Sequence, residues 1–333
     1  MNEESGTVWV MLLPVLVSAT SSVLVSRLGS RMSLIDKPNE RSSHVHPTPR
    51  AGGIGIFLSF LIIGVLFTQE RILILTIGMA GLIGLLDDCF SISSKKRLLL
   101  QLIISAVTVI LLQGTPDSAR ARLLFGGSII FITGTANFYN FMDGINGIAG
   151  LTGVVGFGMM ALFSHFVIGN SDIVIMSIAL SAACVGFLPF NFPKANVFMG
   201  DVGSVSLGFI FAAFVVKLST NINVFLCLIM FLCLFYADAL ITIFSRWLRG
   251  ENLMKAHRSH LYQYLSNELR LPHWKVSVLY AFVQLTFGLL GLLAYRNGII
   301  WQLIILGTFS TFFMISYLTI KSIKPRSKEG EFC

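Results

Sequence analysis

Eleven apolar segments, separated by short polar ones, make up most of this chain. They are Val8–Val25, Ile54–Thr68, Ile72–Leu86, Leu98–Gln113, Leu123–Ala136, Ile148–Ile168, Ile173–Phe190, Val205–Leu218, Val224–Ser245, Val276–Tyr295 and Ile299–Ile320. A helix needs about 20 residues to cross the roughly 30 Å of hydrocarbon in a bilayer, and these runs approach that length. They lack the period-two alternation of a membrane β-barrel. The pattern therefore predicts an all-α polytopic membrane protein, a bundle of about 11 transmembrane helices, with residues 1–333 as one integral-membrane domain.

The composition supports this interpretation. Hydrophobic residues make up 55% of the chain and charged residues only 12%, whereas soluble domains average about 25% charged residues. The first run has no basic flank before it and no clear cleavage site, so we interpret it as a retained span rather than a signal peptide. None of the five cysteines forms a CxxC pair, and neither a disulfide framework nor a zinc site is implied.

The distribution of basic residues predicts the orientation of the bundle in the membrane. If the N-terminus lies outside, nineteen of the 24 Lys and Arg residues fall in inside segments, which the positive-inside rule favours. The net charge of +8 therefore indicates topology rather than a nucleic-acid surface. We expect a periplasmic N-terminus and a cytoplasmic C-terminus. The polar, motif-like segments then all share the inside face: 36–53, 87–101, 137–147, 191–204 and 246–275.

Two of the inside segments, 87–101 and 191–204, carry aspartates with more than one possible role. Asp87 and Asp88 end the third run, where adjacent carboxylates repel each other unless a cation lies nearby; a solvated helix end is the simpler explanation. Asp201 lies in a Gly-flanked turn before a helix, where it can belong to an anion-binding turn or serve as an N-cap. Phe198 in the same segment can stack on a base or anchor the chain at the membrane interface.

The segment NFYNFMDGINGIAG is the most specific of the polar stretches. Asn137, Asn140, Asp143 and Asn146 recur every three residues, so we expect them to share one side of a helix or turn. Oxygen ligands of this kind suit Mg²⁺, which takes one or two carboxylates together with substrate phosphates. A buried polar seam between helices is the alternative.

Basic side chains gather on the same face. The first basic segment, 36–53, contains Lys37, Arg41, His44, His46, Thr48 and Arg50, and the second, 255–263, contains His257, Arg258 and His260. Each segment alone can be topogenic charge and lipid-headgroup contact. Aspartates for a metal and Arg or His for phosphate oxygens on one face are, however, what phosphoryl transfer requires. Asp238, inside the ninth run, is either functional or a partner of Arg246.

Taken in order, these segments resemble the polyprenyl-phosphate N-acetylhexosamine-1-phosphate transferase superfamily, which includes WecA-, WbpL- and MraY-type enzymes. The motifs that carry the resemblance are PTPRAGG, GLLDD, NFYNFMDGINGIAG, FMGDVGS and HRSHLYQ, within a motif core of residues 36–263. HRSH, in place of a His triplet, is most similar to the WbpL-type branch of O-antigen and lipopolysaccharide biosynthesis. The resemblance implies a helical bundle with a cytoplasmic cleft in the inner membrane of a bacterium.

The resemblance also implies roles for individual residues. Asp87, Asp88, Arg97, Asp143 and Arg258 would be catalytic, with Arg97 where many relatives have lysine, and Asp143 and Asp201 would hold Mg²⁺ or Mn²⁺. Substrate-binding residues would be Thr48, Arg50, Gly52, Asn137, Asn140, Asn146, Asn191, Phe198, His257, Arg258 and His260.

The reaction that this family implies is transfer of N-acetylhexosamine-1-phosphate from a UDP-sugar to undecaprenyl phosphate, with release of UMP. Membrane lipids are expected partners, nucleic acid is not, and a homodimer is left open. One alternative is a transporter or flippase of lipid-linked sugars, which would line a path at mid-membrane with polar residues. Another is a lipid-binding scaffold without catalysis.

Overall fold

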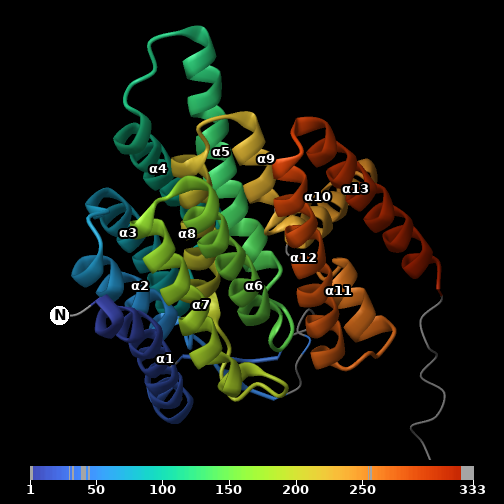
Figure 1. Cartoon of the computed structure of the whole chain (residues 1–333). Coiled ribbons are helices and arrows are strands. Elements are labelled where there is room, and N and C mark those ends of the chain that lie inside the picture. Colours follow the sequence, from blue (N-terminus) through green and yellow to red (C-terminus); the bar gives the residue numbers. More distant parts are fainter. Residues whose placement is uncertain are drawn as a thin grey trace, which may run out of the picture.

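Each of the eleven apolar runs forms helix in the computed structural model of the chain (Figure 1). The structure describes residues 3–29, 31, 34–38, 43, 46–253, 255 and 257–323, and side chains of this part from Val8 onward. Arg41 and His44 of the first basic segment lie outside the described residues. The predicted all-α polytopic membrane fold is confirmed.

The helices follow one another with short connections. Their bounds are α1 (Glu3–Leu28), α2 (Ile54–Phe67), α3 (Arg71–Phe90), α4 (Ser94–Gln113), α5 (Ala119–Phe141), α6 (Ile148–Phe163), α7 (Ser171–Asn191), α8 (Gly200–Leu218), α9 (Ile222–Met230), α10 (Cys233–Leu248), α11 (Leu261–Gln263), α12 (His273–Arg296) and α13 (Ile299–Ser322). Single π-helical turns follow α6 at Ser164–Ile168 and α11 at Tyr264–Glu268. Two short antiparallel strands, β1 (Ile35–Asp36) and β2 (Thr48–Pro49), pair between α1 and α2.

Fewer helices than the predicted eleven are long enough to span a bilayer. Within the described residues, nine helices pass by length and composition, or ten if the bent pair α9–α10 counts as one span. The missing one is α2, whose 14 residues extend only about 21 Å at 1.5 Å per residue. It nevertheless joins the two ends of the bundle. Gly53 before it donates to Met199 O beside α8, and Gln69 after it donates to Asp172 near the start of α7.

The ninth run was expected to be one helix, and this expectation is wrong. α9 and α10 meet at an angle of 86°. Phe231 and Leu232 close α9 with hydrogen bonds to residues three positions earlier. Sharp kinks usually occur at Pro or Gly, but the break contains neither, so nothing in its composition marks it.

Helix α8 lies at the centre of the bundle and positions the polar residues of one end. It packs between α3 and α5 and is buried almost throughout, as expected for a helix that is apolar on all sides. Ser118, Asn170 and Asn221 cap α5, α7 and α9 with their own side chains. The residue before α8, Met199, provides no such cap. The first N–H groups of α8 instead donate to the side chain of Asp88 on α3.

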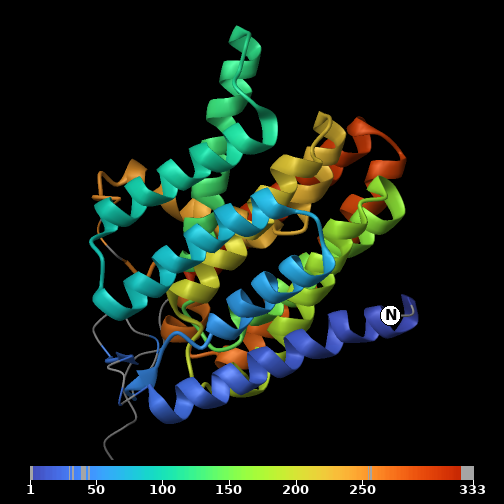
Figure 2. The ribbon, with the colours of Figure 1, turned by 90° about the vertical axis from the view of Figure 1, so that its left-hand side faces the viewer.

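The two ends of the bundle differ. The strands lie at one end and the start of α1 lies at the other (Figure 2). Near the end of α13, Lys321 donates to Ser259 O in the second basic segment. The segments that carry the polar motifs meet at the end with the strands, which we call the strand end.

Candidate active site

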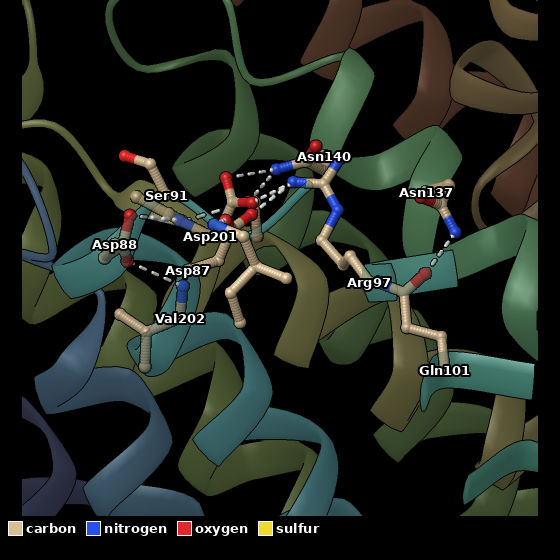
Figure 3. A network of polar contacts seen from close by, with 12 residues as sticks. Asp87, Asp88, Ser91, Arg97, Gln101, Asn137, Asn140, Asp201 and Val202 are labelled. Atoms are coloured by element: carbon tan, nitrogen blue, oxygen red, sulfur yellow. Dashed lines mark hydrogen bonds and ion pairs between the residues drawn. The ribbon is translucent and has the colours of Figure 1, made fainter. Parts of the chain in front are cut away.

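Arg97 joins two of the predicted carboxylates. From the first turn of α4, its guanidinium donates to Asp87 Oδ2 at 2.6 Å and to Asp201 Oδ2, as Figure 3 shows. Asp87 comes from the last turn of α3 and Asp201 from the first turn of α8. The side chain of Arg97 is 16% exposed. The partly buried Arg97 side chain therefore connects the acidic residues of two segments.

Asp88 binds the backbone at the start of α8 rather than Arg97. Its two carboxylate oxygens accept hydrogen bonds from Asp201 N at 3.0 Å and Val202 N at 2.9 Å, visible in part in Figure 3. It therefore caps α8 from another helix, satisfying N–H groups that have no partner within their own helix. Gly200 makes this approach possible: at its φ of +73° an added Cβ would lie 2.6 Å from Asp88 Oδ2.

The PTPRAGG and FMGDVGS motifs lie directly against each other. Gly52 N donates to Phe198 O at 2.9 Å, and Gly53 N donates to Met199 O at 2.8 Å. A Cβ on Gly53 would lie 2.5 Å from the Cα of Gly203, so only glycine fits this contact. From the same segment, Arg50 donates to Asp88 O at 2.6 Å.

The predicted row of asparagines divides into two groups. Asn140, on α5, donates to Asp201 Oδ1 at 2.8 Å and to Ser204 Oγ. Asn137 instead donates to Gln101 Oε1 on α4 at 2.7 Å, away from the carboxylates in Figure 3. The expectation that all four residues share one side is therefore corrected. Asp143 and Asn146 follow the end of α5 at Phe141 and line the same cavity as Asn140, whereas Asn137 does not.

A cavity of about 300 Å³ opens at the strand end between these segments. Its lining includes eight of the predicted site residues: Arg50, Asp88, Asn140, Asp143, Asn146, Asn191, Phe198 and Asp201. The lining does not include the other eight, all of which the structure describes: Thr48, Gly52, Asp87, Arg97, Asn137, His257, Arg258 and His260.

Several of these residues hold the segments in place. Thr48 donates to His46 O, and Gly52 packs on Phe187 and Val197. Asn191 lines the cavity and also joins two motifs: its Oδ1 accepts from Gly147 N at 2.7 Å and its amide donates to Val197 O. The cavity wall is thus built largely from contacts between motifs.

Asp143 differs from the other carboxylates of the cavity. Among the residues that the structure describes, no donor hydrogen-bonds its carboxylate, whereas Asp88 and Asp201 each accept two hydrogen bonds or more. Burial, together with the negative charges of Asp201 and Asp88, raises the pKa of the Asp143 carboxyl well above its usual range. A cation placed beside it would remove this repulsion.

The second basic segment lies next to the cavity wall. His260 is 2% exposed, and its ring stacks on Tyr262 with centroids 5.8 Å apart. Arg258 is 47% exposed and lies 3.9 Å from Glu268. Burial, together with electrostatic interactions with its neighbours His260 and Arg246, lowers the pKa of His257 to about 4, so its imidazole is neutral near pH 7.

Gln263 and His273 also line the cavity, and the sequence analysis did not predict them as site residues. Gln263 follows HRSH and accepts from His260 N at 3.3 Å. His273 begins α12, and its Nδ1 accepts from Asn146 N at 3.4 Å. For Gln263 the signal is its place in HRSHLYQ, and for His273 it is a histidine at the inside end of the tenth apolar run.

The donor set fits a divalent cation bound together with phosphate. No three His, Cys, Asp or Glu side chains in the described part of the chain converge closely enough to hold a metal alone. Mg²⁺ usually takes one or two carboxylates and completes its shell with water and substrate phosphates. Asp143, whose carboxylate accepts no hydrogen bond from the described residues, with Asp201 beside it, meets that requirement.

Comparison with known proteins finds a similar family and similar enzymes. Residues 71–219 match the model of glycosyl transferase family 4. The phospho-N-acetylmuramoyl-pentapeptide-transferases of Staphylococcus aureus strains bovine RF122 / ET3-1 and JH9 are each 29% identical over 276 residues, covering 74% of this chain and 84% of the relative. Both similarities support the resemblance to the polyprenyl-phosphate N-acetylhexosamine-1-phosphate transferase superfamily. The matched region contains Asp87, Arg97, Asp143 and Asp201.

Proposed function

We propose that this chain transfers N-acetylhexosamine-1-phosphate from a UDP-sugar to undecaprenyl phosphate, releasing UMP. The observation that carries the proposal is the Asp143 carboxylate, which accepts no hydrogen bond from the described residues and lies in a cavity shared with Asp88 and Asp201 and bordered by Arg97. Such a cavity is suited to a divalent cation and a diphosphate, and the three aspartates belong to the region that matches the family model.

In this proposal Asp143 and Asp201 hold Mg²⁺, or Mn²⁺ in its place. A bound ion would neutralise part of the negative charge of the donor diphosphate and so reduce its repulsion of the acceptor phosphate. Arg97 keeps Asp201 turned toward the cavity and adds a fixed positive charge near the reacting phosphates.

The reaction that we propose is a direct displacement. An oxygen of undecaprenyl phosphate attacks the β-phosphorus of the UDP-sugar. A new P–O bond forms, the bond from the β-phosphorus to the bridging oxygen breaks, and UMP leaves with that electron pair. The attacking phosphate is already anionic, so orientation and charge compensation supply most of the rate. Both oxygens of Asp88 are engaged by backbone N–H groups, which favours direct transfer over a covalent intermediate on Asp88.

The donor nucleotide would lie along the wall that contains Asn146, Asn191 and Phe198, where amide groups and one aromatic ring face the cavity. Arg258 and His257 lie outside the cavity lining, on the loop beside it. We assign them to the diphosphate or sugar of the bound donor.

An apolar groove of about 520 Å³ supports a lipid acceptor. It lies between α5, α9, α10 and α13, with Phe131, Gly134, Phe138 and Tyr236 in its wall. Its wall on α5 runs from Ile130 to Phe138, and the same helix carries Asn140 of the cavity. We place the polyprenyl chain of the acceptor in this groove.

The location of the reaction follows from the charge bias. We place the protein in the bacterial inner membrane with the strand end, and therefore the cavity, on the cytoplasmic side. The residues before α1 would then be periplasmic and those after α13 cytoplasmic. UDP-sugars and undecaprenyl phosphate would meet at that surface.

Two donor classes deserve comparison. The HRSH sequence supports a UDP-N-acetylhexosamine of O-antigen biosynthesis, whereas the relatives transfer phospho-N-acetylmuramoyl-pentapeptide, as their name states. The test is an assay of the purified protein with undecaprenyl phosphate and Mg²⁺ against UDP-GlcNAc, UDP-GalNAc, UDP-6-deoxyhexosamines and UDP-MurNAc-pentapeptide. We expect lipid-linked product from one N-acetylhexosamine donor. Product from the pentapeptide donor alone would assign the chain to cell-wall synthesis, and no product from any donor would reject the proposal.

A further inference from the structure

The buried carboxylate of Asp238 is distant from the cavity along the chain but is connected to it through contacts. Asp238 lies on α10, has no exposed surface, and accepts hydrogen bonds from Leu261 N at 2.8 Å and Tyr262 N at 3.2 Å. It also accepts from Tyr280 Oη at 2.8 Å on α12, and from Thr242 Oγ1 at 3.2 Å.

Of the two alternatives for Asp238, a functional residue or a partner of Arg246, the structure does not show the pairing with Arg246. Arg246 pairs with Glu251 at 2.8 Å and donates to the carbonyls of Asn252 and Lys255. Asp238 instead accepts hydrogen bonds from Leu261 and Tyr262, which directly follow HRSH. His260 Nδ1 lies 3.4 Å from Asp238 Oδ1.

The contacts continue from Asp238 to the turn that holds Asp143. Tyr262, whose N–H binds Asp238, donates its own hydroxyl to Phe141 O at 2.8 Å. Phe141 ends α5 two residues before Asp143. Tyr262 also packs so closely on Gly144 that a Cβ there would lie 2.2 Å from the hydroxyl oxygen. The next residue, Gln263, lines the cavity.

We propose that Asp238 is a positioning residue that fixes the segment 257–263 against the Asp143 turn. A buried carboxylate is costly unless its acceptors are satisfied, and here two backbone N–H groups and two hydroxyls satisfy it. The bend between α9 and α10 directs α10 to the place where this contact can form. Asp238 thus acts on the reaction through His260, Tyr262 and the Asp143 turn, without touching substrate itself. The catalytic part of this inference rests on the proposed function.

Asp238→Asn is the direct test. The amide keeps the size of the side chain, but its NH₂ group faces an N–H donor, so one of the two backbone hydrogen bonds is lost. We expect kcat to fall by about 10- to 100-fold, the usual cost of removing a group that orients others at a site, with KM for the UDP-sugar changed less. Asp172→Asn is the matched control, because Asp172 accepts a backbone N–H from Gln69 at the opposite end of the bundle. It should leave kcat unchanged.

A second readout does not depend on activity. Hydrogen–deuterium exchange of the peptide 257–264 should become faster in Asp238→Asn and stay as in the wild type in Asp172→Asn, while the other helices keep their protection. Unchanged exchange in 257–264 would overturn the inference whether or not the wild type releases UMP.

A double-mutant comparison separates positioning from general destabilisation. If Asp238 acts through His260 in the segment 257–263, Asp238→Asn should lower activity much less in a His260→Ala background than in the wild type. Fully additive losses would contradict the inference. If the wild type itself releases no UMP, the proposed function is rejected. The exchange result then still tests whether Asp238 fixes the segment 257–263.

Discussion

Asp143 is a carboxylate next to other carboxylates, and among the described residues no donor hydrogen-bonds it as donors do its neighbours. Asp88 is satisfied by the start of α8, and Asp201 by Arg97 and Asn140. The Asp143 carboxyl has a raised pKa because it is buried beside Asp88 and Asp201. In the proposed account the missing partner is the metal–diphosphate complex of the substrate.

Replacing this one charge should therefore abolish turnover while leaving the fold intact. We expect Asp143→Asn to lower Mg²⁺-dependent UMP release by at least about 100-fold, the range seen when one electrostatic group is removed from an active site. Mg²⁺ together with UDP-sugar should raise the Tm of the wild type but not of the variant. Full turnover by a normally folded Asp143→Asn protein would remove the metal role from this residue.

His257 gives a prediction about pH. Its pKa in the folded protein is about 4, against an ordinary value of 6.5, so the unfolded chain binds the proton more readily. Stability should therefore fall as the pH drops from about 6.5 towards 4. His257→Gln removes this contribution, so its Tm should match that of the wild type at pH 7.5 and exceed it at pH 5. Equal Tm values at both pH values would show that His257 titrates normally.

The sequence allowed the residue types of the site to be predicted, but not their individual partners. The three-residue spacing suggested one polar face for all four residues from Asn137 to Asn146. The structure divides them within α5, where Asn137 binds Gln101 on α4 and Asn140 binds Asp201 on α8. Side-chain spacing alone does not show which neighbouring helix a residue meets. Likewise, DD as a pair does not reveal that Asp87 binds Arg97 while Asp88 caps α8.

At the scale of the elements, helices were predictable wherever an apolar run is long. Every run became helix because a lipid environment requires backbone hydrogen bonds to be satisfied within the segment. The bend between α9 and α10 was not predictable, since the break lacks Pro and Gly. Both helices at the bend, α9 and α10, line the apolar groove beside α5, and α10 carries the Asp238 that binds the segment 257–263.

The groove can be tested by filling it. Gly134 lines it, and a Cβ there would meet nothing within 4 Å, so Gly134→Trp should fold. We expect the KM for undecaprenyl phosphate to rise at least about tenfold, since even one methylene in an apolar pocket is worth roughly that much. The KM for the UDP-sugar should not change.

Gly126→Trp provides the control for this substitution. Gly126 lies on the same helix, also has open space around it, and is not part of the groove wall. Its kinetics should equal those of the wild type. An unchanged lipid KM in Gly134→Trp would place the acceptor elsewhere.

At the scale of the whole molecule, the charge bias and the structure agree on one asymmetry. The motifs from the first basic segment to HRSH meet at one end of the bundle, although they are separated by as many as 200 residues or so along the chain. The pattern of apolar runs predicted that they share a face. It could not predict the cavity, because a cavity depends on how side chains from six segments pack.

The orientation of the bundle is open to direct measurement. Lys95→Cys lies at the strand end and Thr115→Cys at the opposite end, both at exposed positions. In a Cys89→Ser, Cys333→Ser background, a membrane-impermeant maleimide should label Thr115→Cys in spheroplasts and Lys95→Cys only in inside-out vesicles. The reverse pattern would place the cavity on the periplasmic side.

The central claim is that a phosphoryl group passes from a nucleotide to a lipid, and the position of one phosphorus atom tests it most directly. The purified protein would be incubated with UDP-N-acetylhexosamine labelled with ³²P at the β-phosphate, undecaprenyl phosphate and Mg²⁺, and then extracted with organic solvent. We predict that the label moves to the lipid phase as undecaprenyl-diphosphate-sugar while unlabelled UMP appears in the aqueous phase. Label that stays in the UDP-sugar, or that appears as inorganic phosphate, would contradict the account.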